Sequence, residues 1–169
     1  WSKSELNAIG IYEIVNDLTN YKDNEYYINT NEQYNFADNQ VTKSWGTATA
    51  RRLNDENAVD EDGNNLLDED GNQIINYGLK TEKKRIVKDQ ASGLLAPTDW
   101  YIVKSTEVAD YNVPDNILSF RADVRSKSNE METQIDACTT VDELKALYEY
   151  TEQEDGTQTR PLAEFPKEI

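Results

Sequence analysis

Apolar residues recur at helical spacing after Leu79 and predict an amphipathic helix there. On a helical wheel, one half is apolar and the other half is charged or polar. The apolar half contains Leu79, Ile86, Val87, Ala91, Leu94 and Leu95, and the polar half contains Glu82, Arg85, Asp89 and Ser92. We expect Pro97 to end this helix, because proline cannot donate the backbone hydrogen bond and clashes with the preceding turn. The aromatic and β-branched cluster at 100–103 then predicts an extended or irregular segment laid against the helix.

Two further helices are predicted after this cluster. One begins at Pro114, because the first helical position tolerates proline. Polar residues at 126–129 interrupt its apolar pattern, which favours either one kinked helix or two short ones. The last helix follows Thr140, which has capping-box spacing to Glu143. The expected buried positions are Ile117, Phe120, Val124, Met131, Ile135 and Cys138 in the second helix, and Val141, Leu144, Leu147 and Tyr148 in the last.

The first half of the chain alternates short β-type runs with Asn and Asp clusters, which predicts a small antiparallel meander. Ser2 and Glu5 have capping-box spacing and predict a short helix at 3–9, ended by Gly10. Gly46 after Trp45 indicates a bulge or close packing. The expected β-type segments are 11–15, Tyr26, Ile28, 33–36 and 41–50.

A five-residue repeat, DEDGN, occurs at 60–64 and again at 68–72. Carboxylates in such numbers raise the hypothesis of a calcium site, because hard cations prefer oxygen ligands. The spacing argues against an EF-hand, since Leu66 and Tyr77 stand where its first and last ligands would be needed. We therefore predict two Asp-Gly turns in a hairpin or loop inserted before the helical half.

Together these elements predict an α+β fold of three parts. Residues 1–78 form a β-rich part with the acidic insert, residues 79–150 form a helical domain, and residues 151–169 form an extended C-terminal arm. Leu162 and Phe165 are the apolar residues by which the arm docks, either on this protein or on a partner.

Charge and composition exclude several functions. Acidic residues outnumber Lys and Arg by 33 to 17, giving a net charge of −16, which disfavours nucleic acids and anionic membrane surfaces as partners. No apolar run approaches the roughly 20 residues that a membrane span requires. The chain has no histidine, and its single cysteine rules out an intrachain disulfide; the spacing of Cys138 from Ile135 favours a buried thiol.

Catalytic and cofactor motifs are not found in the sequence, so we predict a protein that is not an enzyme and needs no cofactor or metal. A carboxylate pair of the glycosidase type requires only two acids in one cleft, and sequence alone does not nominate one. Trp100 and Tyr101 are compatible with a sugar-binding platform, but a place in the core is the more common outcome for such aromatics. A carbohydrate-binding or glycan-cleaving module is therefore kept as an alternative.

The central stretch resembles a known pattern. Its residues are Leu94, Leu95, Ala96, Thr98, Asp99 and Trp100, followed by Pro114 at a helix start and by Arg121 and Arg125 four positions apart. This series resembles the "LLA-TDW … P … YR--LR" pattern of bacteriophage tail assembly chaperones and tail-fibre assembly proteins. The resemblance spans about 79–148, with Phe120 in place of the usual tyrosine, and leaves 1–78 outside it.

The resemblance implies a phage protein that binds other virion proteins of the tail or tail fibre. It would be an accessory or adaptor subunit in the virion, or else a transient assembly chaperone in the host cytoplasm; homo-oligomerisation is left open. In the expected fold, Asp99 orients the turn after the first helix, Trp100 fills the gap between helices, and the two arginines share a helix face where they pair with acids. The candidate partner-binding residues are Trp100, Tyr101, Arg121, Arg125, Leu162 and Phe165.

Overall fold

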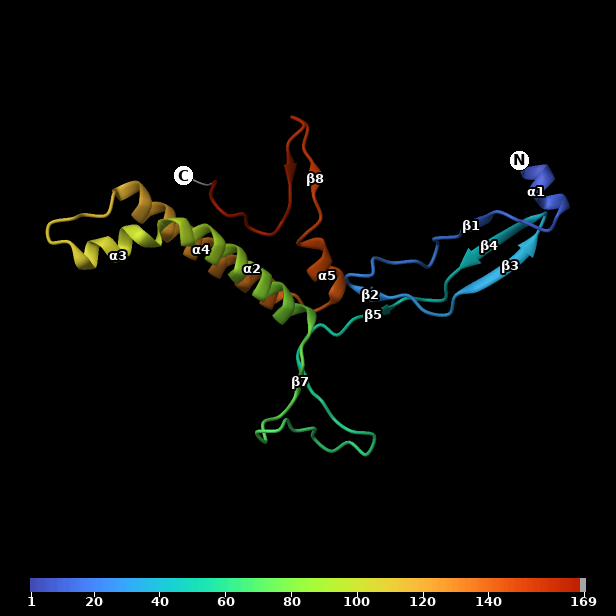
Figure 1. The fold of residues 1–169 in the computed structure, drawn as a ribbon, viewed down its shortest axis with the longest axis horizontal. Helices are drawn as coiled ribbons and strands as arrows, with labels where there is room; N and C mark the ends of the chain where they lie inside the picture. Colours follow the sequence, from blue (N-terminus) through green and yellow to red (C-terminus); the bar gives the residue numbers. More distant parts are fainter. Residues whose placement is uncertain (168–169) are drawn as a thin grey trace. The chain divides into compact units, whose positions relative to one another are not determined.

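The computed structural model describes residues 1–167 and confirms the α+β class (Figure 1). The chain divides into two compact units, Trp1–Arg51 and a second that starts at Arg52. The division therefore lies earlier than the predicted one at residue 78. The physical reason is a set of hydrogen bonds that joins the segment after Arg52 to the start of the long helix: Leu79 N donates to Arg52 O, Lys80 N to Leu53 O, and Gly78 N to Asp55 Oδ1.

The first unit contains one short helix and two small sheets. Helix α1 (Lys3–Ala8) has the predicted capping box of Ser2 and Glu5, and Gly10 follows it with a φ of +82°. Strands β1 (Ile14–Asn16), β4 (Gln40–Ser44) and β3 (Gln33–Ala37) form one sheet in the order β1-β4-β3, while β2 (Tyr27–Ile28) pairs with β5 (Thr49–Ala50). The pairs β3–β4 and β2–β5 are antiparallel as predicted, but β1 runs parallel to β4.

Local turn chemistry explains the β3–β4 hairpin. Asp38 and Asn39 join the strands with φ values of +51° and +57°, a left-handed pair that residues of this type tolerate in two-residue hairpin turns. Gly46 lies between β4 and β5, where an added Cβ would be 3.0 Å from the Asn31 Cβ, so the predicted close packing is confirmed.

The DEDGN repeats form turns at the far end of a short β-ladder in the second unit, in which β6 (Glu56–Asn57) pairs with β7 (Ile75–Asn76). Asp60 accepts hydrogen bonds from the backbone N–H groups of Asp62 and Asn64, and Asp68 repeats the arrangement. Three backbone hydrogen bonds also connect Ala58, Leu66 and Ile74, which follow one another at intervals of eight residues. Leu66 N donates to Ala58 O, Ile74 N to Leu66 O, and Ala58 N to Ile74 O, so the three residues form a closed ring of hydrogen bonds. The predicted insert is thus a pair of Asp-Gly turns held by its own backbone.

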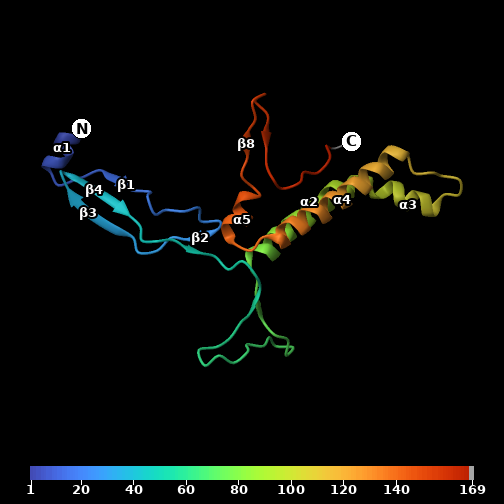
Figure 2. The same cartoon turned by 180° about the vertical axis from the view of Figure 1, so that it is seen from behind.

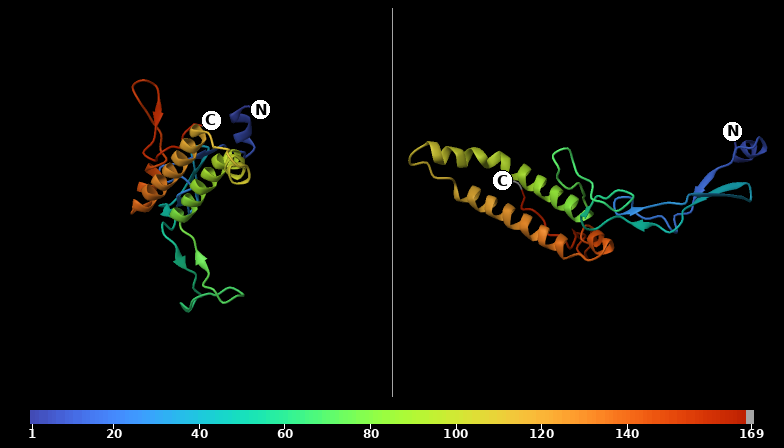
Figure 3. Two further views of the ribbon diagram at one scale, coloured as in Figure 1. Left: turned by 90° about the vertical axis from the view of Figure 1, so that its left-hand side faces the viewer. Right: turned by 90° about the horizontal axis from the view of Figure 1, so that it is seen from below.

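Two long helices form the core of the second unit. Helices α2 (Leu79–Leu95) and α4 (Asp115–Ala137) lie side by side and antiparallel, and Figures 2 and 3 show the same pair from other directions. Helix α4 is uninterrupted, although its pattern predicted a kink or a break at 126–129. Ser128 faces inward there, and Lys127 forms an ion pair with Glu130 one turn on. The short helix α5 (Val141–Ala146) has the predicted Thr140–Glu143 capping box.

The predicted core positions are largely correct. All six apolar positions expected in α4 and at its end are buried, as are Val141 and Leu144 of α5. On α2, Val87 and Ala91 are buried, but Ile86 is 45% exposed, so its predicted place on the buried face is wrong. Lys83 is buried instead, with its ammonium 4.4 Å from the ring centre of Tyr148, because a long side chain can cover apolar surface while its charge meets an aromatic face.

The extended segment predicted at 100–103 is wrong, because the chain there is helical. Pro97 follows the end of α2, but it also lies in the first turn of the short 3₁₀-helix η1 (Ala96–Thr98), which leads directly into α3 (Asp99–Glu107). Proline is compatible with a first helical turn, so the same residue ends one helix and begins the next.

The C-terminal arm is extended only in part. Strands β8 (Thr151–Glu152) and β9 (Gln158–Thr159) pair as a hairpin around Asp155 and Gly156, where an extended arm was predicted. After β9 the chain contacts α4 again, where Ala163 N donates to Gln134 Oε1. The last two residues of the predicted arm lie outside the described residues.

Candidate functional site

Arg121 holds the corner between α2 and α3. Its side chain is almost fully buried, and Nη1 donates to Leu95 O (3.0 Å) and Thr98 Oγ1 (2.6 Å) and forms an ion pair with Asp99 Oδ1 (2.8 Å). Thr98 Oγ1 in turn donates to Leu95 O (2.7 Å). One guanidinium therefore satisfies the carbonyl that α2 leaves free at its end and sets the direction in which α3 departs.

Trp100 points away from the core as a result. Its side chain is 51% exposed, so the prediction that it fills the gap between the helices is wrong. The indole and the Tyr101 ring contact each other with centroids 4.3 Å apart. The prediction is wrong because this segment is helical. Asp99 forms an ion pair with Arg121, and the next residue, Trp100, therefore lies on the outer side of α3.

Further side chains extend this aromatic pair into a surface. The Lys104 ammonium lies 5.2 Å from the centre of the Trp100 ring and 4.2 Å from that of Tyr111, so it bridges two aromatic faces. Val103 is 51% exposed one helical turn after Trp100. We define the α3 surface as Trp100, Tyr101, Val103, Lys104 and Tyr111.

Sequence reasoning included only Trp100 and Tyr101 in this surface. Val103 and Lys104 lie on the same side as Trp100, because 99–107 is a helix and residues three and four apart are neighbours on it. Tyr111 lies beyond the helix and belongs to the surface through its contact with Lys104. Asp99 in the first turn after Thr98 is the available signal for such a helix start.

The remaining predicted site residues lie elsewhere on the second unit. Arg125 is exposed on α4, where Nη1 donates to Arg121 O (3.3 Å) one turn earlier. Leu162 is 2% exposed and its N–H donates to Leu147 O, which places it on its own chain, one of the two options left open for the arm. Phe165 packs on Ala91, Phe120 and Val124.

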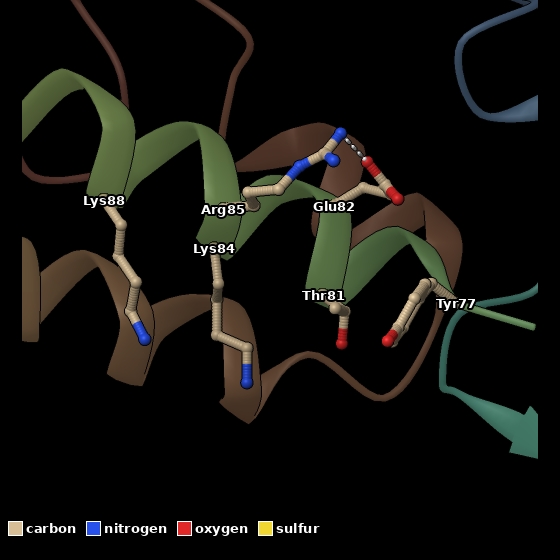
Figure 4. Close-up of a pocket in the computed structure, with 6 residues that line it drawn as sticks. All are labelled: Tyr77, Thr81, Glu82, Lys84, Arg85 and Lys88. Carbon is tan, nitrogen blue, oxygen red and sulfur yellow. Dashed lines mark hydrogen bonds and ion pairs between the residues drawn. The ribbon is translucent and has the colours of Figure 1, made fainter. Parts of the chain in front are cut away.

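A hollow of about 510 Å³ lies along α2, lined by Tyr77, Thr81, Glu82, Lys84, Arg85 and Lys88 (Figure 4). Its basic side chains form ion pairs with carboxylates of this chain. Arg85 contacts Glu82 on the same helix, whereas Lys84 reaches Asp136 (2.8 Å) and Lys88 reaches Glu132 (3.2 Å) on α4. These contacts tie α2 to α4 and give the hollow a structural role.

The described residues, 1–167, contain no group of three or more cysteine and carboxylate side chains placed to hold a metal ion. Within the same range, no helix has the length and apolar content needed to cross a membrane. Cys138 is buried as predicted, and burial raises the pKa of its thiol.

Comparisons of the chain with protein-family models, with curated proteins and with solved structures find no match.

Proposed function

We propose that this chain is a non-enzymatic bacteriophage protein, an accessory or adaptor subunit of the virion tail or tail fibre that binds other virion proteins. The observation that carries the binding role is the α3 surface, in which an exposed indole lies beside a tyrosine and a bridging lysine. Exposed aromatic clusters of this composition are typical of the centres of protein interfaces. The phage assignment rests on the resemblance of 79–148 to tail assembly proteins.

The way α3 is held supports a binding role. Arg121 fixes the corner before the helix, so Trp100 is presented from a rigid element rather than from a loose loop. A preorganised aromatic side chain loses little conformational freedom when a partner covers it. The net charge of −16 makes separate copies of the chain repel each other, which opposes aggregation through such an exposed apolar surface.

Mass spectrometry of purified phage particles tests the proposal. The chain is expected in the virion at a fixed stoichiometry to a tail or fibre protein. Its presence in the infected host but not in particles would instead support the alternative of a transient assembly chaperone. Absence of any association with tail or fibre proteins would contradict both.

Substitution of Trp100 tests the surface itself. Trp100→Ala is expected to weaken association with the tail or fibre partner at least tenfold, since central aromatics contribute about 2 kcal/mol or more to an interface. Ile86→Ala is the matched control, because Ile86 is an exposed apolar residue of the same unit outside the α3 surface. Equal affinities for the two variants would contradict the assignment.

A second candidate function follows from the same exposed rings, because an exposed tryptophan beside a tyrosine also suits the face of a sugar. A glycan array in which binding is lost with Trp100→Ala and retained with Ile86→Ala would favour a carbohydrate-binding module over an adaptor.

A further inference from the structure

The first unit, Trp1–Arg51, buries very little of its own surface. Only Tyr26 and Tyr27 are buried, at 3% and 4% exposure. Ten large apolar or aromatic side chains of the unit are exposed: Trp1, Ile9, Ile11, Ile14, Val15, Leu18, Tyr21, Ile28, Tyr34 and Phe36. A unit of this size is marginal even with a complete core, so it requires a further layer to be stable.

The register of the sheet places three of these exposed residues, Ile14, Tyr34 and Phe36, on one face. Ile14 and Phe36 lie on either side of Val41, and the next row contains Asn16, Lys43 and Tyr34. Side chains directly across neighbouring strands share a face, so these six residues form what we call the Ile14 face. Ile14, Tyr34 and Phe36 are 55–57% exposed. Tyr12 extends the face, with its ring 4.5 Å from that of Phe36.

The opposite face of the same sheet is more polar. It contains Val15, Thr42 and Asn35 in one row, and Ser44 and Gln33 in another. The two faces therefore differ in chemistry although they belong to the same strands. Consecutive residues such as Ile14 and Val15 lie on different faces, so substitutions at the two positions change one face each.

Charge indicates which partner suits the Ile14 face. The chain is strongly acidic, so two copies repel each other over most of their surface. The first unit has four basic and seven acidic residues, against 13 and 26 in the rest of the chain. Lys43 is the one charged residue of the face, and it forms an ion pair with Glu32 at 2.9 Å. Two copies can approach here with little repulsion.

We propose that the Ile14 face is a self-association surface, covered by the same face of a second copy of this chain. Two such sheets packed face to face supply each other with the missing layer, and a two-fold axis brings Ile14 and Phe36 of one copy against those of the other. The inference uses the first unit alone and does not depend on the proposed function.

Sedimentation velocity of the full-length chain over a range of concentrations tests this inference without any variant. The chain is expected to sediment as an oligomer that dissociates on dilution. A chain that stays monomeric up to about 100 µM, where even weak self-association with an affinity near −5.5 kcal/mol is visible, overturns the proposal. That result includes the case in which the second unit or a different protein covers the face.

A pair of neighbouring variants locates the surface. Ile14→Glu places a carboxylate on the face and is expected to weaken self-association at least tenfold. Val15→Glu adds the same charge one residue later on the opposite face and is expected to leave it unchanged. Equal loss in both variants, or retained association in Ile14→Glu, overturns the assignment to this face. Unchanged helical circular dichroism confirms that the second unit is intact in each variant.

Discussion

At the scale of single residues, Gly78 shows how closely backbone segments meet at the start of α2. A Cβ at this position would lie 2.5 Å from both C and O of Asn54 and 2.6 Å from Leu53 O. These atoms belong to the backbone, so no side-chain rotation relieves the clash.

Gly78→Ala is therefore expected to lower the free energy of unfolding of the second unit by about 1–3 kcal/mol, the usual cost of forcing extra volume into a packed site. Gly93→Ala is the control, because Gly93 lies within α2 with open space around it. That change is expected to stabilise by about 0.5–1 kcal/mol, since alanine loses less backbone entropy in a helix. Urea titrations followed by circular dichroism measure both, and a tolerated alanine at 78 would contradict the close approach.

At the scale of elements, the helix caps make stability depend on pH. Glu143 Oε2 accepts hydrogen bonds from Thr139 N (2.6 Å), Thr139 Oγ1 (2.9 Å) and Thr140 N (3.3 Å) at the start of α5. The Thr139 backbone bond, followed by its hydroxyl, lowers the pKa of Glu143 below its usual 4.5. A lowered folded-state pKa contributes stability above the unfolded value, and this contribution is lost as the pH falls through the folded value.

Glu143→Gln is accordingly expected to be less stable than the native chain at neutral pH, and the difference is expected to shrink as the pH falls below 4.5, the usual pKa of a glutamate. Thermal unfolding at a series of pH values measures it. Glu61→Gln is the control, because it removes an exposed carboxylate that lies outside any helix cap. A constant difference between Glu143→Gln and the native chain at all pH values would contradict the cap as its cause.

Local sequence signals explain which of the elements could be predicted. Helices α1, α2, α4 and α5 have local signals in their capping boxes, apolar periodicity or flanking prolines, and those signals do not depend on the rest of the fold. Helix α3 was missed because its Ile102 and Val103 favour strands, whereas contacts of the distant Arg121 hold the corner that starts the helix. The parallel pairing of β1 with β4 likewise depends on a partner far along the chain.

The candidate site was predictable only in part for a related reason. The sequence identifies Trp100, Tyr101 and Arg121 as candidate site residues. Which of them are buried depends on the direction in which α3 leaves Thr98. That turn exchanges the expected roles: the arginine lies in the interior and the tryptophan on the surface.

At the scale of the whole molecule, the two units differ in how they are stabilised. The second unit contains the fully buried side chains Val124, Met131, Ile135 and Leu144, and burying each such residue stabilises by about 1.5–3 kcal/mol. The first unit has only two buried tyrosines. Arg51 ends the first unit and Arg52 begins the second; both are exposed and both are targets for trypsin.

Brief trypsin digestion is therefore expected to cut first after Arg51 or Arg52. The resistant fragment, identified by mass spectrometry, should begin at Arg52 or Leu53. The fragment should keep a cooperative thermal transition, because its core lies entirely within it. An Arg51→Gln, Arg52→Gln double variant should resist this cut and be digested more slowly. Early cleavage within α2 or α4 would instead mean that the second unit depends on the first for its stability.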